Sequence, residues 1–273
     1  MSKRFGFVTF LLFFICTVNV CFGQWVFWTN NEGAGDGQWA TTTNWAVGYP
    51  TASDDVVILK DAGNAAVIRA GVTGYANWMH LCDTSATGSK VLVSGGTLAV
   101  SDHLLIGEWG VDQKGTLQVD SGTVNTVLLM CGGDRGGNNG NGTLIVNGGN
   151  VNIGWLLAVG GGYDGVSTGG VGNVQLAGGV VTMATGGNVI GEGGLIMSNG
   201  GLLNIAGGAL SLNGVITDIT ALANGGTITA YGGTGSFVYD YSIAGRTTVT
   251  AVIPEPATLV VIALGSLLIR RKK

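Results

Sequence analysis

The central chain alternates short apolar runs with glycine-rich corners. Residues 91–108 read VLVSGGTLAVSDHLLIGE, in which a Gly-Gly corner and a Ser-Asp corner divide three apolar runs. Alternating Val, Leu, Ile and Thr are typical of β-strands, and glycine accepts the positive φ that chain reversals need. The segment therefore predicts a unit of strand, corner, strand, corner and strand.

This unit recurs from residues 115 and 142, and more loosely from residue 172. The second corner glycine of each unit falls at Gly96, Gly122, Gly149 and Gly179, in steps of 26, 27 and 30 residues. A single unit of this kind cannot bury its apolar side, so the copies must stack. We predict an all-β fold, a single-stranded parallel β-helix (β-solenoid) of about six coils over residues 67–213.

The register of the units makes specific predictions about side chains inside the solenoid. We expect Leu92, Leu117 and Leu144 to superpose in the interior. The same alignment places Cys82 opposite Gly107 and Gly107 opposite Cys131, so that the two thiols lie two coils apart, about 9–10 Å by strand spacing. A disulfide needs Cα atoms within about 7 Å, which predicts two free, largely buried thiols.

The N-terminal residues 1–23 have the pattern of a secretory signal peptide. Lys3 and Arg4 precede a nearly unbroken apolar run from residue 5 to 20, which predicts a signal helix and export of the mature chain. An uncleaved membrane anchor is the alternative.

Residues 24–66 are rich in tryptophan and lead into the first coil. The stretch GQWATTTNWAVGYPTASDDVVI resembles the opening that precedes β-helical repeats in bacterial surface proteins, including those with autotransporter-associated β-strand repeats. The resemblance implies an N-terminal cap, in which bulky indoles close the end of the solenoid interior. Alternatively, Trp39 and Trp45 are candidate glycan contacts, since indole faces stack on pyranose rings.

Gly- and Asn-rich insertions follow the third strand of successive units. Repeat proteins gather such insertions on one edge, which makes Asp134, Asn139 and Asp164 further candidate glycan contacts. A solvated loop edge is the plainer interpretation. None of the insertions matches the serial Ca²⁺-binding nonapeptide, so we predict no metal site. Residues 214–252 leave the period and predict strands that close or extend the far end.

The C-terminal residues 253–273 read IPEPATLVVIALGSLLIRRKK. Pro254, Glu255 and Pro256, an apolar run, and a basic cluster that includes Arg270 and Arg271 resemble the PEP-CTERM sorting signal. The resemblance implies an exosortase as partner, a short hydrophobic helix that holds the chain in the inner membrane until processing, and delivery to the cell surface or extracellular matrix. An ordinary tail anchor with a chance Pro-Glu-Pro is the alternative.

Composition suits the predicted solenoid, and charge argues against nucleic acid as a binding partner. The chain has 51 Gly and only 10% charged residues, which suits a solenoid with glycine corners and an apolar interior. Six basic and fifteen acidic residues lie in residues 24–253, a net charge of −9. Such a body repels phosphate backbones, so we do not expect nucleic acid as a partner.

Few residues are available for catalysis. The two histidines, His80 and His103, fall in different columns of the alignment, because 25 residues after His80 lies Leu105. Asp83, Glu108 and Glu192 do align, and a pair of acids one coil apart is able to act as general acid and base, although a solvated corner is the commoner reason. We expect no enzyme activity and no cofactor.

Three functions remain in order of preference. The first is an exported structural or adhesive protein of the cell surface or extracellular matrix. The second is a carbohydrate-binding or polysaccharide-active β-helix protein, with extracellular polysaccharide as partner. The third, ice binding, needs a column of threonines, and the residues after the Gly-Gly corner are Thr97, Thr123, Asn150 and then Val180.

Overall fold

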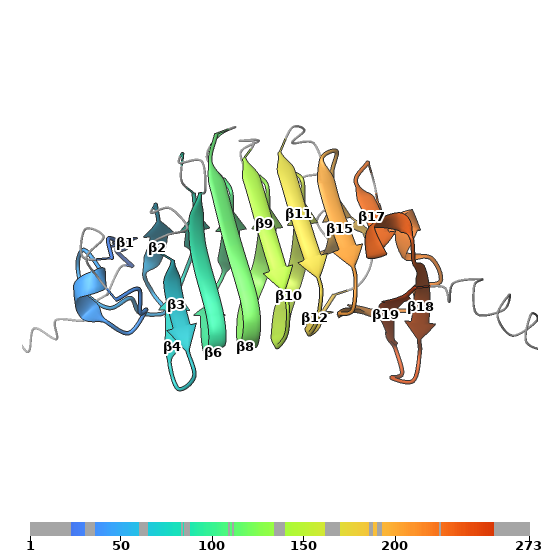
Figure 1. The fold of residues 1–273 in the computed structure, drawn as a ribbon, viewed down its shortest axis with the longest axis horizontal. Coiled ribbons are helices and arrows are strands. Elements are labelled where there is room, and N and C mark those ends of the chain that lie inside the picture. The colour runs from blue at the N-terminus through green and yellow to red at the C-terminus, as the bar shows by residue number, and fades with distance from the viewer. Residues whose placement is uncertain are drawn as a thin grey trace, which may run out of the picture.

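The computed structural model describes most of the region between the two terminal segments. The described residues are 23–30, 36–59, 65–82, 84, 88–108, 110, 112–133, 140–161, 170–185, 188–189, 193–223 and 225–253. They form an all-β structure of stacked coils, a solenoid of about six turns (Figure 1). This confirms the all-β solenoid part of the predicted fold class. The expected terminal helices lie outside the described residues.

The central coils each contribute one strand to each of three faces. The first face consists of β3 (Ala66–Arg69), the start of β6 (Ser89–Val100), the start of β8 (Lys114–Cys131), β9 (Asn141–Val146), β11 (Val171–Leu176), β15 (Gly201–Ile205) and β17 (Thr227–Ala230). The strands of this face pair in parallel, as Figure 1 shows for the row from β3 to β17.

The second face follows the glycine corner. It consists of β4 (Thr73–Ala76), the end of β6, the middle of β8, the start of β10 (Asn150–Val159), β12 (Val180–Met183) and β16 (Ala209–Asn213). The third face consists of β1 (Trp25–Trp28), β2 (Asp55–Ile58), β5 (Met79–Leu81), β7 (His103–Ile106), the ends of β8 and β10, and β14 (Gly193–Met197), with β13 (Asn188–Val189) antiparallel to β14.

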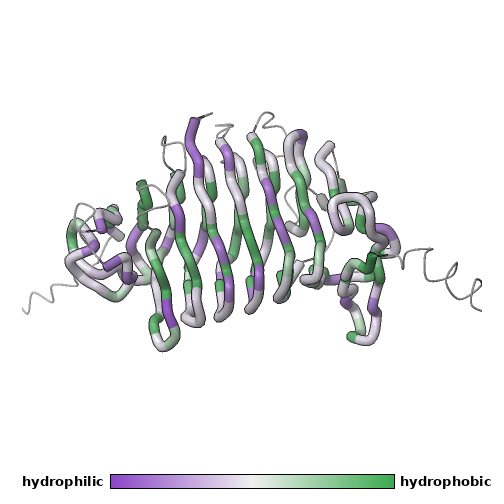
Figure 2. Tube along the Cα trace, viewed as in Figure 1, coloured by the Kyte–Doolittle hydropathy of each residue, from purple (hydrophilic) through white to green (hydrophobic). Residues whose placement is uncertain are grey.

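Alternation along the strands fills the interior with apolar side chains. Figure 2 shows hydrophobic residues interspersed with hydrophilic ones along the stacked coils. One column on the first face consists of Ala66, Val91, Leu117, Leu144, Val174, Leu203 and Ile228, all of them buried. Leu117 and Leu144 pair as expected. Leu92 pairs with Gln118 and is only half-buried, so its predicted place in the column was wrong.

The corner glycines explain this error. Val91, Leu117 and Leu144 each lie five residues before a corner glycine, whereas Leu92 lies four before it. A shift of one residue turns a strand side chain to the opposite side of the sheet. Distance to the corner therefore sets the register, and residue type does not.

The corner glycines stack directly on one another. Gly122, Gly149 and Gly179 have φ of 91°, 73° and 64°, which only glycine adopts readily. A Cβ on Gly122 would lie 2.2 Å from the carbonyl oxygen of Gly96, and one on Gly149 would lie 2.4 Å from that of Gly122. At this corner the coils touch backbone to backbone, without room for a side chain.

The third face is buried on its outer side as well. Its outward residues form a second apolar cluster of Leu105, Leu128, Met130, Leu156, Ala158 and Ile196, against which Trp78 and Trp155 pack. Strands buried on both sides read as continuous apolar runs, which accounts for segments such as LLMC and LLAV at this position of the repeat.

Cys82 and Cys131 form no disulfide and are buried, as expected, but their alignment was wrong by one residue. Cys131 pairs with Ile106, which pairs with Leu81. Cys131 therefore follows Leu81 in an interior column and does not share a column with Cys82.

Two irregular segments bound the coils. At the N-terminal end, the 3-10 helix η2 (Thr42–Asn44) precedes Trp45, and β1 pairs in parallel with β2. At the far end, β17 adds a parallel strand to the first face, and β19 (Arg246–Val252) pairs antiparallel with β16 and with β18 (Ser236–Asp240). The 3-10 helices η4 (Ile219–Leu222) and η5 (Tyr231–Gly233) flank β17.

Candidate functional site

The two tryptophans considered as glycan contacts lie inside the protein. Trp39 is 0% exposed and Trp45 is 4% exposed. Their rings meet edge to face at 4.6 Å between centroids, Trp28 packs on Trp45 at 4.8 Å, and Nε1 of Trp45 donates to the Trp39 carbonyl oxygen. These indoles join the N-terminal end of the interior, so neither Trp39 nor Trp45 presents a ring face to a sugar in this fold.

The other site predictions fall mostly outside the described residues. These are the sorting residues Pro254, Glu255, Pro256, Arg270 and Arg271, the insertion residues Asp134, Asn139 and Asp164, and the acids Asp83 and Glu192.

Glu108 is the described member of the acid column, and it is buried. It is 1% exposed, and its Oε1 contacts Nδ1 of His80, which is 3% exposed. The half-exposed ring of Trp25 stacks on His80 at 5.2 Å. Glu108 is thus enclosed with a histidine partner, which does not fit a solvated corner.

His103 belongs to a neighbouring cluster on the outer side of the third face. Its Nδ1 lies 2.8 Å from Oδ1 of Asp102, and Nε1 of Trp78 donates to Oδ2 of the same carboxylate at 3.1 Å. The Trp78 and His103 rings stack with centroids 4.1 Å apart. His80 pairs with Leu105 as expected, so the two histidines are in different columns, yet Trp78 contacts both rings. The 25-residue offset that relates His80 to Leu105 also relates Trp78 to His103.

The threonine column is longer than the repeats indicated. Thr73 pairs with Thr97, and Thr97 pairs with Thr123, so three threonines stand in register on the second face. Asn150 and Val180 then continue the column. The alignment began at Thr97 and missed Thr73 because the earliest coil has a degenerate sequence.

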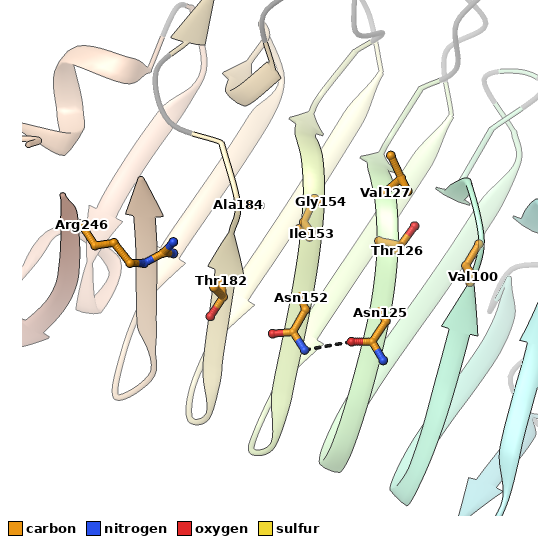
Figure 3. A pocket seen from close by; sticks show the side chains of 10 residues that line it. All are labelled: Val100, Asn125, Thr126, Val127, Asn152, Ile153, Gly154, Thr182, Ala184 and Arg246. Carbon is orange, nitrogen blue, oxygen red and sulfur yellow. Dashed lines mark hydrogen bonds between the residues drawn. The ribbon is translucent and has the colours of Figure 1, made fainter. Parts of the chain in front are cut away.

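A groove that the sequence did not predict crosses the strands of the second face. Its volume is about 400 Å³. Figure 3 shows its residues on successive strands, from β6 through β8, β10 and β12 to β19. They are Val100, Asn125, Thr126, Val127, Asn152, Ile153, Gly154, Thr182, Ala184 and Arg246.

The register of the coils orders the polar groups of this groove. Asn125, Asn152 and Thr182 are neighbours on consecutive strands, and Nδ2 of Asn152 donates to Oδ1 of Asn125 at 2.9 Å. The apolar margin consists of Val127, which is 41% exposed, with Gly154 and Ala184. A β-bulge places two residues of β10, Gly154 and Trp155, opposite the single residue Val127 of β8.

Arg246 stands at one end of the groove and is fixed by hydrogen bonds. Its Nη2 donates to the carbonyl oxygens of Met183 and Ser211 at 2.9 and 3.1 Å, and its Nε donates to Oγ of Ser211 at 3.2 Å. Among the residues that the structure describes, Arg246 is the only charged one that lines the groove. No carboxylate of a described residue forms an ion pair with it.

Comparison with known proteins gives no relative. No protein-family model, no curated protein and no solved structure matches the chain.

The described residues also lack a membrane-spanning helix and a metal-binding cluster. Within that part of the chain, no helix has the length and apolar character required to span a membrane. The same residues contain no group of three or more His, Cys, Asp or Glu side chains arranged to hold a metal ion.

Proposed function

We propose that the chain is an exported structural or adhesive protein whose solenoid is displayed at the cell surface or in the extracellular matrix. The observation that carries this proposal is the construction of the body. A continuous apolar interior and stacked glycine corners give a stiff scaffold, and its outward positions form polar ladders along the first two faces. One such ladder runs from Gln175 through Asn204 to Thr229, with hydrogen bonds of 2.9 and 3.0 Å.

The terminal segments support the route of export. The signal-like residues 1–23 and the Pro-Glu-Pro tail resemble an exosortase substrate, and the apolar run of residues 257–269 spans only ~20 Å of a ~30 Å hydrocarbon core. A short segment with basic residues behind it suits a temporary tether.

The geometry around Glu108 supports catalysis less well than display. Glu108 is paired with His80 below the surface, and an acid that works on a polymer must reach the substrate bond. We therefore assign the body a role in display and binding.

The sorting proposal is tested by replacing Pro254, Glu255 and Pro256 together with alanine in the native host. We expect the intact mass to keep the tail and the protein to remain in the membrane fraction. The matched control replaces Val252 and Ile253, two exposed residues directly before the motif, with alanine and should be sorted normally. Identical mass and location of the motif variant and the control would refute the sorting route.

Carbohydrate binding is a second candidate function, and the groove on the second face favours it. Sugar sites combine apolar surface with a few oriented polar groups, and the groove offers both side by side.

A further inference from the structure

We infer that the groove on the second face binds an extended segment of an acidic polysaccharide, with a uronate carboxylate at Arg246. This inference rests on the second proposed function, carbohydrate binding, and is independent of how the protein is sorted. It adds the position of the site, the direction of the bound polymer and the class of sugar.

The hollow depends on the absence of a side chain at Gly154. A Cβ built there would lie 3.5 Å from the Val127 Cα and 3.7 Å from the Thr126 oxygen, which are ordinary contacts. Gly154 is also not among the described glycines that have a positive φ. Neither crowding nor backbone conformation requires glycine at this position, in contrast to the corner glycines. A role in leaving the groove open accounts for it.

The polar side of the groove repeats with the spacing of the coils. Asn125, Asn152 and Thr182 follow one another at about 4.8 Å, the separation of neighbouring strands, which is comparable to the length of one pyranose ring in a linear glycan. The bond between the two amides uses one donor of Asn152 and one acceptor position of Asn125. The side-chain amino group of Asn125 and the side-chain oxygen of Asn152 can still form hydrogen bonds with ligand hydroxyls.

Charge sets the kind of sugar. The bonds of Arg246 to Met183 and Ser211 engage Nε and Nη2, and they hold the guanidinium toward Thr182 in Figure 3. Nη1 has no bond to a described residue. A planar guanidinium suits a carboxylate, and no other described residue with a charge lines the groove. The body as a whole, residues 24–253, carries a net charge of −9, so polyanions are not attracted without this specific contact.

A glycan fits this groove better than an acidic peptide. The backbone groups of β8, β10 and β12 already pair with each other in register, so a peptide strand finds no free edge along the groove. The ligand must instead run across the strands and meet side-chain amides, hydroxyls and small apolar surfaces in each coil. A chain of hydroxyl-bearing rings meets that requirement.

The test uses the full-length chain in detergent and measures its binding to polygalacturonate and to a neutral β-1,4-glucan. We expect the wild type to prefer the uronate polymer. Gly154→Phe should weaken binding to both polymers by about tenfold or more, because the ring fills the groove. Val215→Phe, which adds the same ring at a position that is 71% exposed and outside the groove, should bind as the wild type does.

Arg246→Gln should remove the preference for the uronate polymer while binding to the neutral glucan persists. Circular dichroism checks that this variant folds, and Arg246→Lys, which keeps the charge, should retain part of the preference. The inference is wrong if the wild type binds neither polymer, or if Gly154→Phe binds polygalacturonate normally. Equal affinity for polyglutamate would also overturn it, since charge alone would then explain binding. None of these outcomes depends on the sorting tail.

Discussion

Replacement of a corner glycine tests how closely the coils are stacked. Gly149 has φ of 73°, and a Cβ added to it would lie 2.4 Å from the Gly122 carbonyl oxygen and 2.9 Å from the Gly122 nitrogen. Gly71 is the matched control, because it has φ of 80° with nothing within 4 Å of its added Cβ. Both Gly→Ala variants carry the backbone strain of left-handed geometry, and only Gly149→Ala also carries the clash.

The magnitudes follow from these two terms. A residue with Cβ in the left-handed region costs about 1–2 kcal/mol, which is the whole expected effect of Gly71→Ala. To restore an ordinary contact of 3.4 Å, the Gly122 oxygen must move by about 1 Å against the inter-coil hydrogen bonds, and overpacking of this kind costs about 1–3 kcal/mol more. We therefore expect Gly149→Ala to destabilise the protein by about 2–5 kcal/mol.

Thermal and guanidinium unfolding followed by circular dichroism provide the assay. A stacked repeat can unfold in parts. The unfolding midpoints of the two variants are therefore compared, and not a free energy of unfolding extrapolated for each. The midpoint of Gly149→Ala should fall about 1.5 to 4 times as far as that of Gly71→Ala. Equal midpoints would show that the coils do not meet backbone to backbone at this corner.

Three further predictions concern individual side chains. Trp39→Ala should destabilise the fold by about 3–5 kcal/mol, while Trp25→Ala, at a half-exposed ring, should have a much smaller effect on the unfolding midpoint. Hydrogen bonds from Gln118 and Asn147 lower the pKa of Asp120. The contribution of this carboxylate to folding stability is therefore complete above its unfolded pKa of about 3.9, and it is lost as the pH falls through the lower pKa of the folded state. Asp120→Asn should therefore lower the midpoint at pH 7 and have less effect near pH 2, and an equal shift at both would contradict this. Burial raises the pKa of Cys131 to about 12, so iodoacetamide should modify it only after unfolding, and intact mass should not change on reduction.

Local sequence determined much of the fold and little of the groove. The glycine corners recur because stacked backbones leave no room for a Cβ, so Gly122, Gly149 and Gly179 could be identified from spacing alone. Leu92 was misplaced because Val91 and Leu92 are both good strand formers. Only the distance to the corner glycine shows that Val91 is the one that faces inward.

The groove depends on contacts between segments that are far apart in the sequence. Arg246 reaches it from an antiparallel strand outside the repeats and bonds Met183, 63 residues earlier. Gly154 is one of 51 glycines, and what separates it from those that the backbone requires is that it has neither a positive φ nor a close contact at its Cβ position. Trp39 and Trp45 were ambiguous for a related reason, since an indole suits an end plug as well as a sugar platform, and burial decides between them.

Display of the solenoid outside the cell is tested most directly by labelling Val215→Cys on intact producing cells with a bulky, membrane-impermeant maleimide. Residue 215 is exposed and lies outside the groove, whereas the native Cys82 and Cys131 are buried, so wild-type cells supply the background. We predict that Val215→Cys is labelled on intact cells to the same extent as in lysed cells. Labelling that appears only after lysis would place the solenoid inside the cell and contradict the proposed function.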